Sequence, residues 1–149
     1  MDLFERRRNL LGGKGDKKKF FLYKAGWTGV QNCSINHYSK RYTFQSNCVS
    51  IGASSYAGNF ILENITNLNS YKKLCVTYFV NVSRCAIRVG TNVTNGGVYG
   101  NTIYGELTIN QISTVEFNIN NIWSLLDMYM PAHSSNDDSF QIYEIWLEK

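Results

Sequence analysis

The sequence contains little proline, little histidine and few charged residues. It has one proline, Pro131, and two histidines, and only 17% of its 149 residues are charged, against about 25% in a typical globular domain. No run approaches the ~18 consecutive apolar residues of a membrane-spanning helix, and no apolar segment of a secretory signal follows the charged start. We therefore expect a protein made in the cytoplasm without a signal peptide and with no membrane partner.

Motifs of catalysis and of metal binding are also absent from the sequence. His37 and His133 stand far apart, whereas a zinc site needs three or four ligands at characteristic spacings. Neither a Gly-x-Ser-x-Gly motif nor a P-loop occurs. Asn136, Asp137 and Asp138 could supply calcium ligands, but the spacing of a calcium loop is missing and a solvated turn explains them better. We expect no metal and no cofactor.

The cysteines show no Cys-x-x-Cys spacing, and with no secretion signal we expect them to be reduced, small apolar core residues. Four cysteines allow three pairings, and a pairing of Cys75 with Cys85 across a hairpin stays open at this point. The four are Cys33, Cys48, Cys75 and Cys85.

The positive charge of the chain is confined to its first residues. Residues 1–19 hold seven basic and three acidic residues, and the remaining 130 residues hold eight of each. Residues 2–11 predict a short helix, and a glycine-rich joint follows it at 12–15. We expect a basic leader over 1–17 that docks on a neighbour and a separate domain over 18–149. Nucleic acid is not an expected partner, because the body is neutral and the leader has too few basic residues on one face.

The rest of the chain reads as short strands separated by turns. Tyrosine, asparagine, serine and threonine replace the missing charge, and strand-like runs of β-branched and aromatic residues end at glycine- and asparagine-rich turns. In the last run the alternation of apolar residues breaks, which permits a β-bulge. We predict an all-β fold, an antiparallel, jelly-roll-like β-sandwich with a short N-terminal helix. The predicted strands are 20–23, 42–51, 59–63, 74–82, 85–91, 102–109, 114–119, 125–130 and 140–147.

Aromatic residues in or beside loops suggest ligand binding. A sugar ring has an apolar C–H face and a polar rim, so flat aromatic faces with amide, hydroxyl and charged groups recognise it. If two or three such rings converged at one edge of the sandwich, they would form a platform, although each tyrosine could instead be a half-buried strand residue with a hydrated hydroxyl. The candidate ligand-binding residues are Trp27, Tyr38, Tyr42, Tyr56, Tyr99 and Tyr104.

Several segments, taken in order, carry a resemblance to a known group of proteins. They are Arg-Arg-Asn-Leu-Leu-Gly-Gly-Lys at 7–14, Lys-Lys-Phe-Phe-Leu-Tyr-Lys at 18–24, Asn-Ser-Tyr-Lys-Lys-Leu-Cys-Val at 69–76 and Ile-Tyr-Glu-Ile-Trp-Leu-Glu at 142–148. The sequence resembles tail- or fibre-type structural modules encoded by prophages of Gram-positive bacteria. The resemblance implies a virion-associated protein made in a bacterial cytoplasm, self-association, and no catalytic residues.

We therefore expect a non-catalytic, phage-derived module that recognises a surface carbohydrate or a neighbouring virion protein. One alternative is a small glycan-active hydrolase on the same scaffold, which needs two carboxylates about 5–9.5 Å apart in one cleft. Another is a pure assembly scaffold, which needs an exposed apolar surface that buries at least about 1,000 Å² on self-association. Glu63, Glu106 and Glu116 fall on the polar side of the strand patterns, as solvated residues do.

Overall fold

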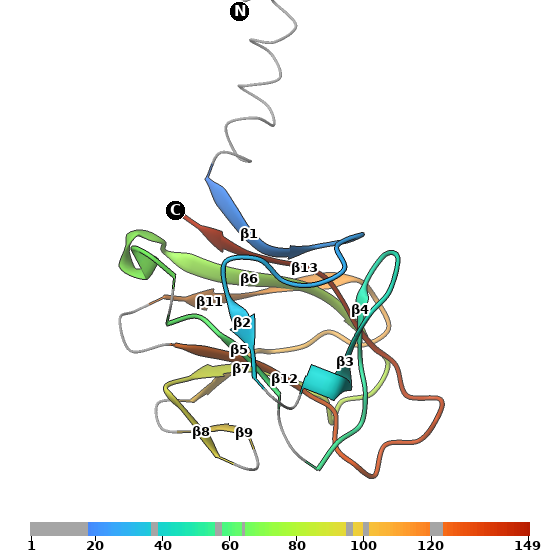
Figure 1. The fold of residues 1–149 in the computed structure, drawn as a ribbon. Coiled ribbons are helices and arrows are strands. Elements are labelled where there is room, and N and C mark those ends of the chain that lie inside the picture. The colour runs from blue at the N-terminus through green and yellow to red at the C-terminus, as the bar shows by residue number, and fades with distance from the viewer. Residues whose placement is uncertain are drawn as a thin grey trace, which may run out of the picture.

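The protein is an all-β structure in which two antiparallel sheets pack face to face (Figure 1). The computed structural model describes residues 18–36, 39–55, 58–63, 65–94, 97–99, 102–119 and 124–149. The predicted N-terminal helix and glycine-rich joint lie outside the described residues. The expectation of an antiparallel, jelly-roll-like sandwich is confirmed.

The first sheet contains six strands in the order β11-β6-β13-β4-β3, and β1 also pairs with β13. The long strand β13 has β6 along one side, whereas β4 and β1 share its other side, one at each end. The strands are β1 (Lys19–Lys24), β3 (Tyr42–Phe44), β4 (Val49–Ile51), β6 (Lys73–Val80), β11 (Ser113–Asn118) and β13 (Phe140–Glu148).

The second sheet contains five strands in the order β10-β7-β12-β5-β2. Its strands are β2 (Ser34–Ile35), β5 (Asn59–Ile61), β7 (Ala86–Gly90), β10 (Ile103–Tyr104) and β12 (Leu125–Tyr129). A separate hairpin, β8 (Asn92–Thr94) and β9 (Gly97–Tyr99), lies with β9 against β7 and β12. Short 3₁₀ turns occupy Ser39–Arg41 and Leu68–Ser70.

The core lies between the two sheets and follows the period-2 pattern of the strands. Val76 and Tyr78 of β6 and Ile145 of β13 face Ile87 of β7 and Met128 of β12, and all five are buried. The bulge that the sequence permits is present in β13, because the register of β13 with β6 shifts between Ile142 and Glu144. This extra residue lets the apolar side chains on both sides of the bulge face the same core.

Some predicted strands have other limits in the structure. The run predicted over 42–51 is divided into β3 and β4 by a turn in which the Gln45 N–H donates to the Cys48 carbonyl. The run predicted over 102–109 keeps only β10. Strands β2, β8 and β9 were not predicted, because each has only two or three residues.

The four cysteines are free, so a pairing of Cys75 with Cys85 is not formed. Cys75 lies on β6 opposite Trp146 of the same sheet, whereas Cys85 precedes β7 of the other sheet and belongs to the core. Burial raises the pKa of the Cys75 thiol to about 12 and that of the Cys85 thiol to about 11. Both side chains therefore remain neutral thiols at neutral pH, as expected for buried cysteines.

Within the described part of the chain, no helix has the length and apolar character needed to cross a bilayer.

Candidate functional site

A groove of about 750 Å³ opens at the edge of the sandwich where β10 and β11, the end strands of the two sheets, come together. We call it the Tyr104 groove. Residues 103–106 form one side of the groove and residues 114–119 form the other, with buried Val115 and Phe117 at its base. Its lining consists of Ile103, Tyr104, Gly105, Glu106, Thr114, Val115, Glu116, Phe117, Asn118 and Ile119.

Gly105 brings the two sides of the groove close together. Its N–H donates to the Ile87 carbonyl at 2.8 Å, which extends the contact of β10 with β7. A Cβ atom at this position would lie 2.6 Å from Val115 Cγ2 and 3.0 Å from Phe117 Cζ. Only glycine therefore allows the backbone at position 105 to come this close to Val115 and Phe117.

Tyr104 presents the largest exposed aromatic surface of the groove. The residue is 61% exposed, yet its hydroxyl accepts a hydrogen bond from Arg88 Nη1 at 3.2 Å. The Arg88 guanidinium carbon also lies 5.7 Å from the centre of the Tyr104 ring. The ring is thus available to solvent while its outer end is held in place, a combination suited to stacking against a ligand.

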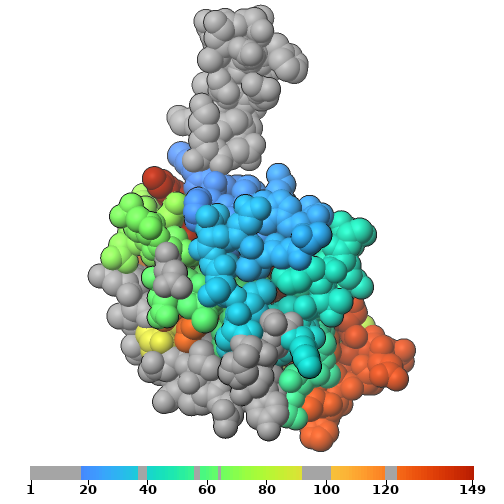
Figure 2. All heavy atoms as spheres, in the orientation of Figure 1, coloured from blue at the N-terminus to red at the C-terminus, as the bar shows by residue number. Residues whose placement is uncertain are grey.

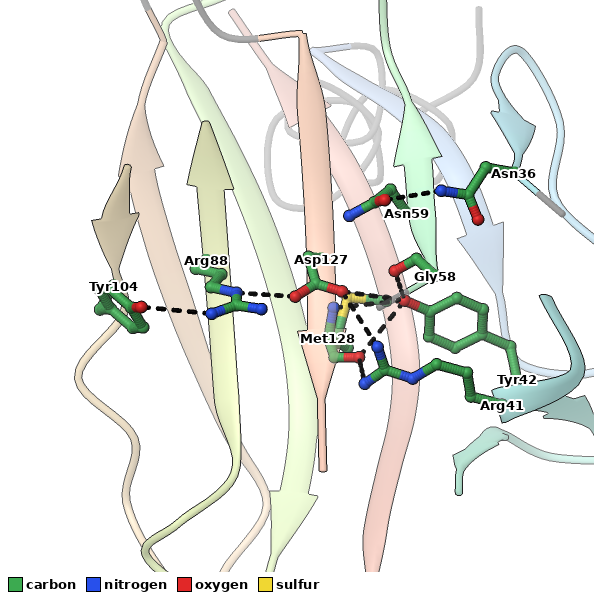
Figure 3. A network of polar contacts seen from close by, with 9 residues as sticks. All are labelled: Asn36, Arg41, Tyr42, Gly58, Asn59, Arg88, Tyr104, Asp127 and Met128. Carbon is green, nitrogen blue, oxygen red and sulfur yellow. Dashed lines mark hydrogen bonds and ion pairs between the residues drawn. The ribbon is translucent and has the colours of Figure 1, made fainter. Parts of the chain in front are cut away.

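Behind Tyr104, a row of polar side chains crosses the second sheet on the face opposite the core (Figure 3). Arg88 of β7 donates from Nε to Asp127 Oδ2 of β12 at 2.7 Å, and Arg41 Nη1 lies 3.4 Å from Asp127 Oδ1. Burial raises the pKa of Asp127, although the guanidiniums of Arg41 and Arg88 act in the opposite direction. Burial lowers and Asp127 raises the pKa of Arg88, and the net direction is upward.

The row continues on the other side of Asp127. The Tyr42 hydroxyl donates to the Gly58 carbonyl, and burial raises the pKa of Tyr42. Asn36 Nδ2 donates to Asn59 Oδ1 at 2.6 Å, and among the described residues the buried Asn59 Nδ2 has no acceptor. This row fixes the position of Arg88 and, through Arg88, that of the Tyr104 ring.

The opposite side of the Tyr104 groove carries hydrogen-bonding side chains. Thr114, Glu116 and Asn118 alternate with buried residues along β11 and are exposed. Glu116 Oε2 lies 3.0 Å from Lys73 Nζ, with both side chains in contact with solvent. Glu106 is also exposed, and no described Lys, Arg or His lies within ion-pair distance of it. The groove therefore combines an aromatic face with carboxylate, amide and hydroxyl groups.

Of the predicted ligand-binding residues whose side chains the structure describes, Trp27, Tyr42 and Tyr104, only Tyr104 lines this groove. Trp27 packs partly against the core, edge-on to Tyr23 at 6.4 Å, and lines a smaller hollow formed by residues 26–31. Tyr42 is 5% exposed, and its ring and hydroxyl contact other buried groups. It therefore cannot offer a ring face to a ligand. Tyr38 and Tyr56 lie outside the described residues, and for Tyr99 the structure describes only the backbone, in β9.

Four residues of the groove were not predicted as site residues: Glu106, Thr114, Glu116 and Asn118. For the three residues on β11, the alternation of residues 115–119 shows which side chains face outward. Glu106 and the β11 residues line one groove only because the sandwich brings the edges of its two sheets together. No local pattern in the sequence reports this arrangement.

The loop that holds Asp137 and Asp138 protrudes from the body of the protein (Figure 2). Asp138 Oδ2 accepts the Ser135 N–H at 2.9 Å and forms an ion pair with Arg84. The carboxylate is therefore occupied in closing a turn, as the sequence indicated. Among the residues that the structure describes, no group of three or more potential metal ligands comes together.

No family model and no curated protein sequence matches the chain. Among solved structures, the fold is similar to that of a family 29 carbohydrate-binding module, CBM29_1, from Piromyces equi, with a TM-score of 0.52 and 11% sequence identity. The match covers 88% of this chain and 90% of that module. At this identity the likeness shows a shared β-sandwich fold.

Proposed function

We propose that this protein is a non-catalytic carbohydrate-binding module whose Tyr104 groove receives part of a glycan. The observation that carries the proposal is the exposed Tyr104 ring, held by Arg88 at the mouth of a groove of about 750 Å³. The ring can stack on the C–H face of a sugar, while Glu106, Glu116 and Asn118 can accept or donate hydrogen bonds at its hydroxyl groups. The fold shared with a carbohydrate-binding module supports the proposal.

The two carboxylates of the groove support binding over hydrolysis. A glycosidase needs one carboxylic acid kept protonated by apolar surroundings and a second carboxylate facing it. Glu106 and Glu116 are both exposed to solvent, and Glu116 already has Lys73 as a partner. Both side chains are therefore suited to hydrogen bonding with sugar hydroxyls.

A Tyr104→Ala variant tests the proposed function. Loss of the stacking ring should weaken binding to a glycan identified on an array by about tenfold or more, because an aromatic contact contributes roughly 1 kcal/mol beyond its buried area. Ile112→Ala is the matched control, since Ile112 is also 61% exposed and does not line the groove. Titration calorimetry gives both affinities. Absence of binding to any glycan by the unaltered protein, with bacterial cell-wall polysaccharides included, would refute the proposal.

Assembly into a larger particle is a second candidate function, and it matches the resemblance to prophage tail modules. Ile103, which lines the groove, is exposed, and so are Ile109 and Ile112, which follow it within ten residues in the chain. Exposed apolar residues in one segment are typical of a contact surface. Light scattering at two protein concentrations tests this role, and a strict monomer at both concentrations would count against it.

A further inference from the structure

We infer that the Tyr104 groove selects a glycan that carries free amino groups, an inference that rests on the proposed carbohydrate-binding function. The ligand class would be a cationic amino sugar, whose ammonium group meets Glu106 while its ring lies on Tyr104. The argument comes from the distribution of charge around the groove.

The lining of the groove contains two acidic side chains and no basic one. Glu106 lies on the side of Tyr104, and Glu116 lies on the β11 side. Lys73 reaches Glu116 from the neighbouring strand β6, so it neutralises at most one of the two carboxylates. The groove therefore has a net negative charge, and a positively charged ligand group would balance it.

Glu106 is the carboxylate that can form an ion pair with a cationic ligand. It is exposed, and the ion pairs found among the described residues use other carboxylates. A hydrogen bond between an ammonium and a carboxylate is about twice as strong as one between neutral groups. The adjacent Tyr104 ring adds an attractive π-face for the same cation. A neutral sugar lacks the attraction between opposite charges, and an acidic sugar would be repelled by Glu106.

The nearby guanidinium of Arg88 does not reverse this preference. Arg88 donates one hydrogen bond to the Tyr104 hydroxyl and another to Asp127 at 2.7 Å, a carboxylate that Arg88 shares with Arg41. The Arg88 side chain is also largely buried, so it directs its hydrogen bonds inward instead of offering them to a carboxylate in the groove.

Three oligosaccharides with one backbone test the inference. They are the β-1,4-linked hexamers of glucose, N-acetylglucosamine and glucosamine, which differ only in the substituent at C2. Calorimetry at about pH 5.5, where the amino groups of the glucosamine hexamer are protonated and an ordinary glutamate is still ionised, should show that this hexamer binds at least about fivefold more tightly than the other two. Added salt should reduce this difference because it screens charges at the surface. Glu106→Gln should remove the preference, so that the three hexamers bind with similar affinities.

Glu63→Gln is the matched control, because Glu63 is an exposed glutamate outside the groove, and it should keep the preference. Circular dichroism confirms that each variant is folded. Equal or weaker binding of the glucosamine hexamer would overturn the inference, and so would a preference that survives in Glu106→Gln. If a neutral hexamer binds and Tyr104→Ala abolishes that binding, the proposed function stands while the inference fails.

Discussion

At the scale of single residues, Gly105 determines whether the Tyr104 groove can form. In a Gly105→Ala variant the new methyl group would lie 2.6 Å from Val115 Cγ2 and 3.3 Å from the Ile87 carbonyl oxygen. Since both neighbours are in the packed sandwich, we expect a loss of about 1–3 kcal/mol in the free energy of unfolding, the usual cost of overpacking. Urea denaturation measures this loss, and the glycan affinity should fall with it.

Gly29→Ala is the control for this change, because a Cβ at Gly29 meets no atom within 4 Å. It should leave stability unchanged or raise it by about 0.4–1 kcal/mol through a less flexible unfolded chain. If both glycine variants unfolded at the same urea concentration, the close approach at Gly105 would not constrain the edge of the sandwich.

The tyrosines show how far a sequence predicts the role of a single residue. Tyr42 and Tyr104 both stand at the edge of a strand-like run beside a turn, and both were predicted to bind a ligand. The structure buries Tyr42 and leaves Tyr104 exposed. The difference arises because Tyr42 follows the 3₁₀ turn Ser39–Arg41, which brings its ring against Phe60 at a centre distance of 5.1 Å. Contacts with partners distant in the sequence decide burial, and a local pattern does not contain them.

At the scale of elements, Asp127 joins the central strand β12 to its neighbour β7 and to the turn that carries Arg41. In Asp127→Asn, two buried guanidiniums lose the carboxylate that they share. We expect a loss of about 3–5 kcal/mol in the free energy of unfolding, as found when one partner of a buried ion pair is removed. Where the variant remains folded, weaker glycan binding should accompany the loss, because Arg88 no longer holds Tyr104 in place.

Asp138→Asn provides the comparison, because Asp138 pairs with Arg84 in the protruding loop and is not part of the polar row on the second sheet. Chemical denaturation should show a smaller loss than for Asp127→Asn, because the Arg84 side chain of this pair is 47% exposed and solvent screens its charge. Equal losses would mean that the polar row contributes no more to stability than a surface ion pair.

The elements differ in how well the sequence predicts them, and length explains most of the difference. Strands β11 and β13 were predicted from alternating apolar residues, and β6 and β12 from apolar runs bounded by turn residues. Strands β2, β8 and β9 have two or three residues and depend on pairing with neighbours. The polar row was not predicted, because Asp127 stands in an apolar run and its partner Arg88 lies 39 residues away.

At the scale of the whole molecule, the two sheets are held together by an apolar core and by no disulfide bond among the cysteines. A chain of 149 residues buries roughly 70% of the surface exposed when it is unfolded. A core of this size does not need covalent links, and the sandwich itself was predicted from strand periodicity and turn residues, independently of the cysteines.

The buried thiols should make the whole molecule less stable as the pH rises into the alkaline range. Burial raises the pKa values of Cys33 and Cys75 to about 12 and that of Cys85 to about 11, from 9.0 in the absence of burial. Between about pH 9 and pH 11 the unfolded chain releases thiol protons that the folded protein keeps, so the free energy of unfolding should fall as pH rises. Urea denaturation between pH 8 and 10.5 measures this slope, and Cys75→Ser should reduce it. A thermal midpoint at pH 7 that falls on addition of a reducing agent would contradict the argument, because free thiols have no bond to lose.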